Sequence, residues 1–321
     1  MYLGIEIGGT KLQIGVGPGD GTIAGLWRGS IDASSGAAGI RNQILAAIPE
    51  LLNAQRIALT RVKAAGIGFG GPIDDDRGCV ITSHQIPGWT DFPLPAWLNG
   101  KLHVPVRMGN DADVAGLAEA VYGAGKGTSP IFYMTIGSGI GGGLIIDGTI
   151  YRAAGRGAAE VGHLRLPDQW TGTGLATLED QASGWGIERR VRKRLTTHAD
   201  SLIFSLAGDA PATTHHVAEA ARRGDTFALQ VLEHARSAIA EALCAVITLN
   251  CPRRIVIGGG VSLLGEDLFF APLRQAVAER VFQPFSGLTT IVPAALGEAV
   301  VVHGALALAR GEGACASKSA E

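Results

Sequence analysis

Two glycine-rich segments carry residue types that could bind a phosphate group. The first, Gly8-Gly9-Thr10, separates two runs in which apolar residues alternate with small or polar ones. The second, Gly137 to Gly143, again separates two apolar runs. Glycines leave backbone N–H groups open to a phosphate, and Thr10 adds a hydroxyl donor. The alternation predicts two β-hairpins with phosphate-binding turns, and the competing interpretation is a pair of ordinary surface hairpins.

Polar residues at two further positions could take part in phosphate chemistry. Glu6 stands just before the first glycine turn, where its carboxylate could hold a magnesium ion. Asn110 and Asp111 follow an apolar strand and precede a helix, the place where open α/β sheets bind ligands. There Asp111 could accept the proton of a sugar hydroxyl that attacks a γ-phosphate, while Asn110 orients the sugar. The competing interpretation is that both residues only cap the helix.

The remaining sequence predicts the elements that position these residues. Strands are expected at 65–69, 104–108, 131–136, 143–146 and 254–257. Helices are expected at 39–52, 113–122, 179–194, 217–223, 226–249 and 298–310. The predicted buried side of helix 226–249 consists of Leu229, Leu232, Ile239, Leu243, Val246 and Ile247. Strands mixed with helices in this order indicate an α/β fold.

We expect two domains and a tail within the 321 residues. A small α/β domain covers 1–112, and a large α/β domain covers 113–297. The helix at 298–310 packs back on the first domain, and 311–321 form a flexible tail. The sequence turns small and polar after Gly311, which is the basis for the predicted tail.

Composition narrows the possible partners and the compartment. The net charge of −2 and the 17% of charged residues argue against a nucleic-acid surface. No run of about 18 apolar residues is present, so we expect no membrane span. The chain starts with a strand and lacks a secretion signal, and its four cysteines have no CxxC spacing. We therefore expect a cytoplasmic protein with reduced cysteines.

Seven motifs along the chain resemble those of ROK-family sugar kinases, in their order and approximate spacing. They are GIEIGGTK, GIGFGGPID, IPGWTDFPL, GNDAD, TIGSGIGGG, EVGH and IGGGVS. The resemblance runs from Leu3 to about Arg310. It implies a two-domain α/β fold of the actin/hexokinase (ribonuclease H-like) type with an interdomain active-site cleft. It also implies ATP- and magnesium-dependent phosphorylation of a hexose by a homodimer.

The resemblance also implies a role for individual residues. Asp111 matches the catalytic base, and Glu6 matches an acid that faces magnesium through water. The residues that match nucleotide-binding positions are Gly8, Gly9, Thr10, Lys11, Gly137, Ser138, Gly139, Gly258, Gly259 and Gly260. Those that match sugar-binding positions are Gly71, Asn110, Asp111, Glu160, His163 and Glu179.

The sequence departs from the family pattern at a zinc motif. Most family members follow the GH motif with CxCGxxGCxE, whose cysteines join the histidine on a structural zinc. Here threonine stands at each of these places, in Thr171, Thr173 and Thr177. A neutral hydroxyl is a poor zinc ligand, so we expect no zinc and a loop held by packing of Trp170 and Leu175.

Smaller departures affect the magnesium and sugar sites. Glu6 replaces the usual aspartate, Gly70 stands where proline is common, and His84-Gln85 replaces an asparagine-containing stretch. The resulting hypothesis is a kinase that phosphorylates glucose or a close relative at the 6-hydroxyl. Mannose, fructose, allose, glucosamine and N-acetylated hexosamines stay open as substrates, as does polyphosphate as donor. The alternative is a non-catalytic sugar-binding or regulatory protein of the same family.

A DNA-binding regulator is disfavoured, because no basic recognition helix precedes the strand that begins at Leu3. The expected partners are therefore a hexose and a nucleotide, without nucleic acid or membrane.

Overall fold

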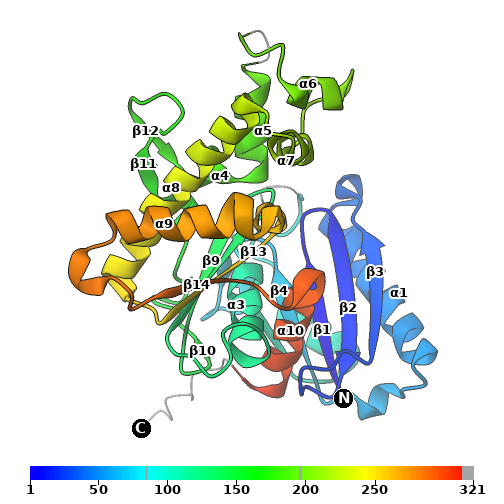
Figure 1. The fold of residues 1–321 in the computed structure, drawn as a ribbon. Helices are drawn as coiled ribbons and strands as arrows, with labels where there is room; N and C mark the ends of the chain where they lie inside the picture. Colours follow the sequence, from blue (N-terminus) through cyan, green and yellow to red (C-terminus); the bar gives the residue numbers. More distant parts are fainter. Residues whose placement is uncertain (84–85, 195–196, 313–321) are drawn as a thin grey trace. The chain divides into compact units, whose positions relative to one another are not determined.

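The computed structural model describes residues 1–83, 86–194 and 197–312 (Figure 1). Spatial proximity of the Cα atoms divides the chain into two compact units. The first unit comprises Met1–Tyr133, Gly143–Ala159 and the segment from Ala294; the second comprises Met134–Gly142 and Glu160–Pro293. The structure is mixed α/β with two five-stranded sheets, which confirms the predicted α/β class. The domain boundaries at 112 and 297 stay a prediction.

The first unit contains a sheet with the strand order β3-β2-β1-β4-β7. Its strands are β1 (Tyr2–Ile7), β2 (Lys11–Gly17), β3 (Gly25–Ser30), β4 (Ala64–Phe69) and β7 (Val106–Asn110). Strands β1 and β2 form the predicted antiparallel hairpin, in which Ile7 pairs with Leu12. Strands β4 and β7 run parallel to β1. The short strands β5 (Ile73–Asp74) and β6 (Cys79–Val80) pair separately.

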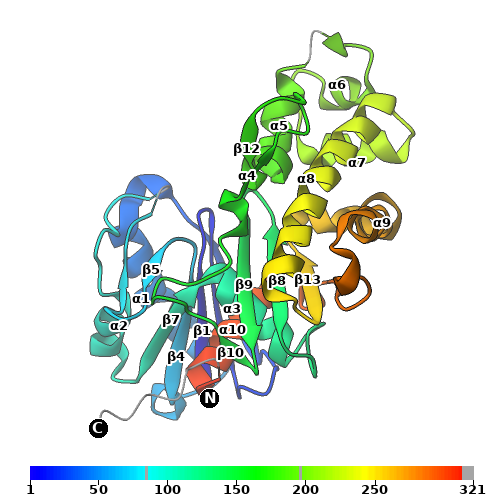
Figure 2. The ribbon, with the colours of Figure 1, turned by 90° about the vertical axis from the view of Figure 1, so that its left-hand side faces the viewer.

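Helices cover both faces of this sheet (Figure 2). One face carries α1 (Gly36–Ala54) and α2 (Leu94–Leu102), and the other carries α3 (Asp111–Val121) and α10 (Val300–Arg310). Successive side chains of β1 point to opposite faces of the sheet, so helices can pack on both faces. Leu3, Ile5 and Ile7 enter the apolar core on one face. Gly4 faces α10, and a Cβ atom added there would lie 2.7 Å from the Val302 carbonyl oxygen. Glycine therefore lets the helix lie directly against the strand.

The second sheet has the strand order β10-β9-β8-β13-β14. Its strands are β8 (Ile131–Ile136), β9 (Ile140–Ile146), β10 (Thr149–Ile150), β13 (Arg254–Gly258) and β14 (Thr290–Pro293). The second hairpin is confirmed, but the prediction that its turn spans Gly137 to Gly143 is wrong, because β9 starts at Ile140. A Cβ atom added at Gly143 would lie 3.0 Å from the Asp113 Cα. This glycine thus serves close packing inside a strand.

The second unit is rich in helices, and α8 (Thr226–Asn250) packs against α4, α7 and α9 (Figure 1). The others are α4 (Leu178–Ala182), α5 (Gly184–Arg192), α6 (Leu202–Ala207), α7 (Thr214–Arg222) and α9 (Ala271–Arg280). The single helix predicted at 179–194 is wrong, because Ser183 is extended and its side chain caps α5 through the Gly186 N–H. The predicted burial of Leu229 is also wrong, since it is 38% exposed.

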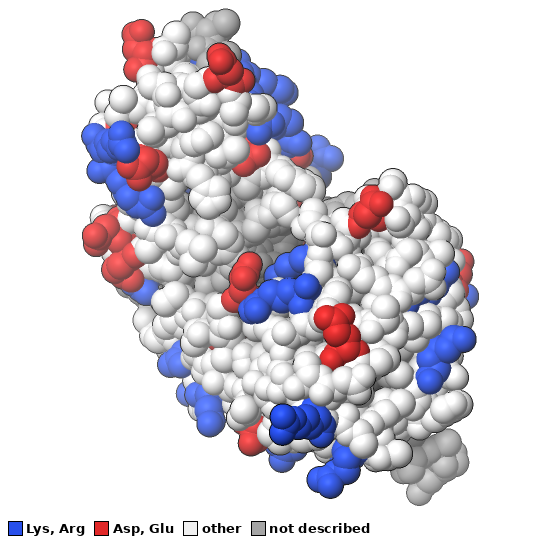
Figure 3. All heavy atoms as spheres, turned by 90° about the vertical axis from the view of Figure 1, so that its right-hand side faces the viewer, with Lys and Arg blue, Asp and Glu red and all other residues white. Residues whose placement is uncertain are grey.

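Acidic and basic side chains are interspersed among uncharged residues on the face drawn in Figure 3. The charge on this face is therefore mixed in sign, in keeping with the net charge of −2. Among the helices within the described ranges, none combines the length and the apolar character that crossing a membrane requires.

Candidate active site

Three parallel strands of the first unit end side by side, and two of these ends lead directly into the predicted site residues Gly8 and Asp111. Ile7 of β1 pairs with Phe69 of β4, which pairs with Asn110 of β7. The chain continues from these strands into Gly8, Gly70 and Asp111. A Cβ atom added at Gly70 would lie 3.3 Å from Asp111 Oδ2 and 3.4 Å from the Gly8 Cα. The first glycine turn and the Asp111 carboxylate therefore meet at one edge of the sheet.

Asn110 and Asp111 are both held by hydrogen bonds at the start of α3. The Ala112 N–H lies 2.9 Å from Asn110 Oδ1 and 2.8 Å from Asp111 Oδ1, and both oxygens accept from it. Asn110 Nδ2 donates to the Gly71 carbonyl oxygen at 3.1 Å. Both residues thus cap the helix, as the competing interpretation expected. Capping uses Asp111 Oδ1, whereas Asp111 Oδ2 lies beside Gly70.

The Glu6 side chain forms an ion pair with Lys11, which the sequence pattern alone does not predict. Its Oε1 is 3.0 Å from Lys11 Nζ, across the turn made by Gly8, Gly9 and Thr10. Its Oε2 is buried and has no hydrogen-bond partner among the described residues. Carboxylate oxygens are ligands that magnesium prefers, and a bound magnesium ion usually keeps several of its waters. Glu6 as a magnesium residue stays a proposal.

Burial controls the protonation of Glu6. It raises the pKa of Glu6 above the ordinary value of 4.5, against the opposing effect of the Lys11 ammonium. The folded state therefore binds this proton more tightly than the unfolded state does. The contribution of Glu6 to the free energy of unfolding therefore decreases as the pH rises above 4.5, the ordinary pKa of a glutamate.

The Glu6→Gln variant tests this effect, because glutamine does not titrate. We expect the free energy of unfolding of the variant to rise relative to wild type between pH 4.5 and neutral pH. Urea denaturation at several pH values, with EDTA to remove divalent ions, measures the difference. A difference that stays constant or changes in the opposite direction contradicts the expectation.

The second glycine turn, in the second unit, has a defined pattern of hydrogen bonds. Gly137 N donates to the Gly139 carbonyl oxygen at 2.9 Å. The carbonyl oxygens of Gly137 and Ser138 accept from the N–H groups of Gly184 at 2.8 Å and Trp185 at 3.3 Å. These bonds do not use the N–H groups of Ser138 and Gly139. Two successive N–H groups of this kind suit a phosphate oxygen.

Other predicted site residues of the second unit surround this turn. Glu179 Oε2 accepts from the Ile140 N–H at 2.8 Å. Gly162 packs directly against the Ile140 carbonyl oxygen, and its neighbours Glu160 and His163 are exposed. Gly259 has a φ of +86°, and a Cβ atom there would lie 2.5 Å from the Ile136 carbonyl carbon. The second turn, the EVGH motif, Glu179 and the third glycine segment are thus assembled at the end of β8.

The hairpin that follows the EVGH motif has threonines in place of the cysteines of the zinc motif. Strands β11 (Arg165–Pro167) and β12 (Leu175–Thr177) form a hairpin, and Thr177 Oγ1 accepts from the Asp180 N–H. His163 is exposed. Among residues 1–83, 86–194 and 197–312, no cluster of His, Cys, Asp and Glu fits a metal ion. The residues at this place therefore do not fit zinc, because threonine hydroxyls replace its thiolate ligands.

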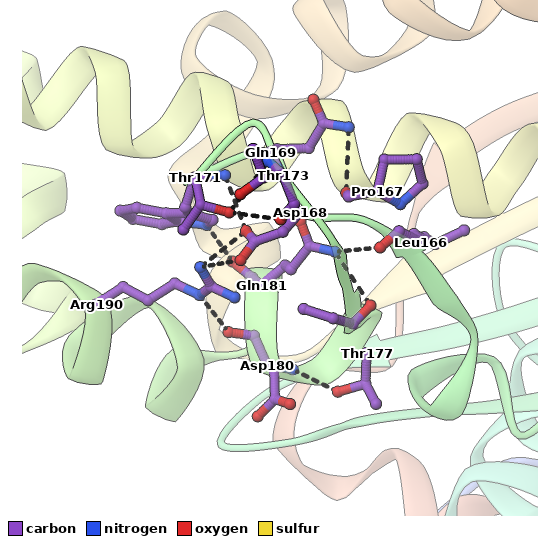
Figure 4. Close-up of polar contacts among 12 residues, drawn as sticks. Leu166, Pro167, Asp168, Gln169, Thr171, Thr173, Thr177, Asp180, Gln181 and Arg190 are labelled. Carbon is purple, nitrogen blue, oxygen red and sulfur yellow. Dashed lines mark hydrogen bonds and ion pairs between the residues drawn. The ribbon is translucent and has the colours of Figure 1, made fainter.

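Side-chain contacts stabilise this loop (Figure 4). Arg190 Nη1 binds both carboxylate oxygens of Asp168, at 2.9 and 3.1 Å. Gln181 Oε1 accepts from the Gln169 N–H, and the Gln181 carbonyl oxygen accepts from Trp170 Nε1. Burial alone would raise the pKa of Asp168, but the Trp170 N–H and Arg190 outweigh it and lower that pKa.

Packing of Trp170 is confirmed, since it is buried, whereas the expected packing of Leu175 is wrong, because its side chain is 57% exposed. Leu175 projects from a two-stranded hairpin, whose open side leaves it in solvent.

We expect the purified protein to hold no zinc and to keep its unfolding midpoint after dialysis against EDTA. Elemental analysis and thermal unfolding measure these two properties. One tightly bound zinc per chain would overturn the expectation.

Arg190→Met should lower the free energy of unfolding by about 2 kcal/mol, because it leaves Asp168 without its guanidinium partner. Urea denaturation of the variant and the wild type measures the difference, and an unchanged free energy of unfolding would contradict it.

The contacts of Gly184 and Trp185 with the second turn were not predicted. The available signal in the sequence was Ser183, because serine is typical of the position before a helix and here indicates that a new helix starts within residues 179–194. His84-Gln85, expected to affect sugar preference, lies outside the described residues.

Comparison with known proteins gives consistent matches along the chain. The sequence model of the ROK family matches residues 2–312. The glucokinase of Thermotoga maritima is 31% identical over 310 residues, covering 95% of this chain and 96% of the relative. The glucokinase of Halalkalibacterium halodurans is 32% identical over 281 residues, covering 85% of this chain and 84% of the relative.

The solved structures agree with these matches. A ROK family glucokinase from Streptomyces griseus, in complex with glucose and AMPPNP, superposes with a TM-score of 0.81. It is 29% identical, with 96% of this chain and 99% of that chain covered. These matches confirm the predicted fold of the hexokinase type. The glucokinase relatives support sugar phosphorylation as the chemistry. The chain belongs to the ROK family.

Proposed function

We propose that the protein is an ATP-dependent hexose kinase that phosphorylates glucose or a close relative at the 6-hydroxyl. The observation that carries the proposal is the meeting of Asp111 Oδ2, Gly70 and Gly8 at the ends of β7, β4 and β1. A carboxylate beside a glycine turn at the carboxyl ends of parallel strands suits proton transfer next to a bound phosphate. The glucokinase relatives and the AMPPNP complex of one family member support the same reaction.

In this proposal, Asp111 accepts the proton of the sugar hydroxyl as that oxygen attacks the γ-phosphate. The ADP oxygen is the leaving group, and capping of the Ala112 N–H fixes the orientation of the carboxylate. Asn110 and Gly71, already joined by a hydrogen bond, border the sugar. Gly8, Gly9, Thr10 and Lys11 bind phosphate oxygens on the first unit.

The second unit supplies further groups for the nucleotide and the sugar. The N–H groups of Ser138 and Gly139 bind phosphate oxygens, and Gly258 to Gly260 border the adenosine. Glu160, His163 and Glu179 hydrogen-bond sugar hydroxyls. A magnesium ion, when bound beside Glu6, would neutralise charge on the transferring phosphate. The homodimer expected from the resemblance is part of this proposal.

A coupled ADP-release assay over a panel of hexoses and hexosamines tests the proposal. We expect sugar-dependent ADP release, strongest with glucose or a close relative, and a sugar 6-phosphate as product. A parallel reaction with polyphosphate in place of ATP identifies the donor. Binding of a sugar without ADP release from any member of the panel would instead support the non-catalytic sugar-binding alternative.

A further inference from the structure

We propose that Glu179 is a positioning residue for the phosphate donor, because its carboxylate holds the glycine turn 137–140 in shape. This role differs from the sugar contact that the resemblance implies for the same residue. The inference rests on the proposed function, since it takes the turn as the binding site of the nucleotide phosphates.

The two oxygens of the Glu179 carboxylate are placed differently. Oε2 accepts from the Ile140 N–H at 2.8 Å, a charge-assisted bond to the backbone of the turn. A Cβ atom added at Gly139 would lie 2.5 Å from Oε2 and 3.9 Å from Oε1. Oε2 is therefore committed to the turn, and Oε1 is the oxygen that lies farther from it.

The backbone around Glu179 is fixed, so the carboxylate can act as a rigid support. Thr177 caps α4 by accepting the Asp180 N–H at 3.1 Å. Leu178 N donates to the Leu164 carbonyl oxygen at 2.9 Å, and Ser183 N donates to the Glu179 carbonyl oxygen at 3.1 Å. These bonds tie the first turn of α4 to its neighbours on both sides.

Residues 179–185 contact both ends of the glycine turn 137–140. Glu179 binds Ile140, where β9 begins, while Gly184 and Trp185 donate to Gly137 and Ser138, directly after β8. This arrangement leaves the N–H groups of Ser138 and Gly139 between two anchored ends. Their direction toward a phosphate oxygen therefore depends on the Glu179 carboxylate.

Binding of the AMPPNP–magnesium complex without sugar, measured by calorimetry, separates this role from any sugar contact. We expect Glu179→Ala to weaken nucleotide binding roughly tenfold, the effect of losing one charge-assisted hydrogen bond. Glu179→Gln keeps an acceptor for the Ile140 N–H, so it should stay within about threefold of wild type. Wild-type affinity in Glu179→Ala, or equal weakening by both substitutions, would overturn the proposal.

Gly139→Ala gives a second, independent measurement. Its methyl group should displace Oε2 and weaken nucleotide binding in the wild-type background, with little further effect in Glu179→Ala. Additive effects of the two substitutions would contradict a shared contact. Circular dichroism confirms that each variant is folded.

The ADP-release assay of the wild-type protein tests the kinase function separately. Intact turnover by wild type, together with unchanged nucleotide binding in Glu179→Ala, would reject only the positioning role.

Discussion

Asp111→Ala should lower kcat for sugar phosphorylation by roughly 10³-fold while the fold is preserved, because it removes the proposed general base. The side chain lies half-buried at the end of β7, with Oδ2 beside Gly70 and Oδ1 on the Ala112 N–H. Asn110 also caps that N–H, so α3 keeps one cap when the carboxylate is removed. Steady-state kinetics with saturating sugar and ATP, together with circular dichroism, measure both parts of the expectation.

Two further variants, one at Asp111 and one at a control position, separate the loss of the base from a structural effect. Asp111→Asn keeps an oxygen for the Ala112 N–H but cannot accept a proton, so its kcat should be nearly as low as that of Asp111→Ala. Asp91→Asn is the matched control, because Asp91 is an exposed aspartate of the same unit that pairs with Arg77. It should retain wild-type turnover. Near-normal phosphorylation by Asp111→Asn would reject Asp111 as the base.

The position of Asp111 could be predicted because local patterns specify it. An apolar strand followed by Asn-Asp and a helical pattern predicts a strand end and a helix start, and the structure has both at residues 110–111. The first hairpin was equally predictable, since alternation on both sides of Gly8-Gly9 sets its register. Such features depend on residues that are close in the sequence.

Features that depend on distant packing were not predictable. Gly143 looks like part of a turn, but it lies in β9 because α3 packs against its backbone. Leu229 fits the apolar pattern of α8, yet its position at the edge of the buried side leaves it 38% exposed. A hydrophobic pattern gives the buried side of a helix but not the extent of its neighbours.

In the candidate site, too, features set by neighbouring residues were predictable and features set by distant residues were not. Glycine turns and strand ends are visible in the sequence, whereas the partners of Glu6 and Glu179 are not. Lys11 lies near Glu6 only after the hairpin closes, and Ile140 lies 39 residues from Glu179 along the chain. A lone acid therefore gives no sequence signal that distinguishes a sugar ligand from a support for a backbone loop.

Glu119 is a second such acid, and Glu119→Ala should lower the free energy of unfolding by about 3–5 kcal/mol. The residue is fully buried in α3, and its two oxygens accept three backbone N–H groups. Oε1 accepts from Ala295 and Leu296 at 2.9 Å each, and Oε2 accepts from Ala124 at 2.7 Å. The carboxylate thereby joins the end of α3 to the segment that leads into α10.

Removing the buried carboxylate leaves three backbone N–H groups, which are partly buried, without their acceptor. Glu119→Gln should be intermediate, since its amide oxygen can still accept while its NH₂ group faces an N–H. Glu50→Ala is the control, because the exposed Glu50 accepts only from Trp27 Nε1 among the described contacts and should cost about 1 kcal/mol or less. Urea denaturation measures all three variants. Equal losses for Glu119→Ala and Glu50→Ala would show that α10 is held by its apolar contacts with β1 and β4, without a substantial contribution from this carboxylate.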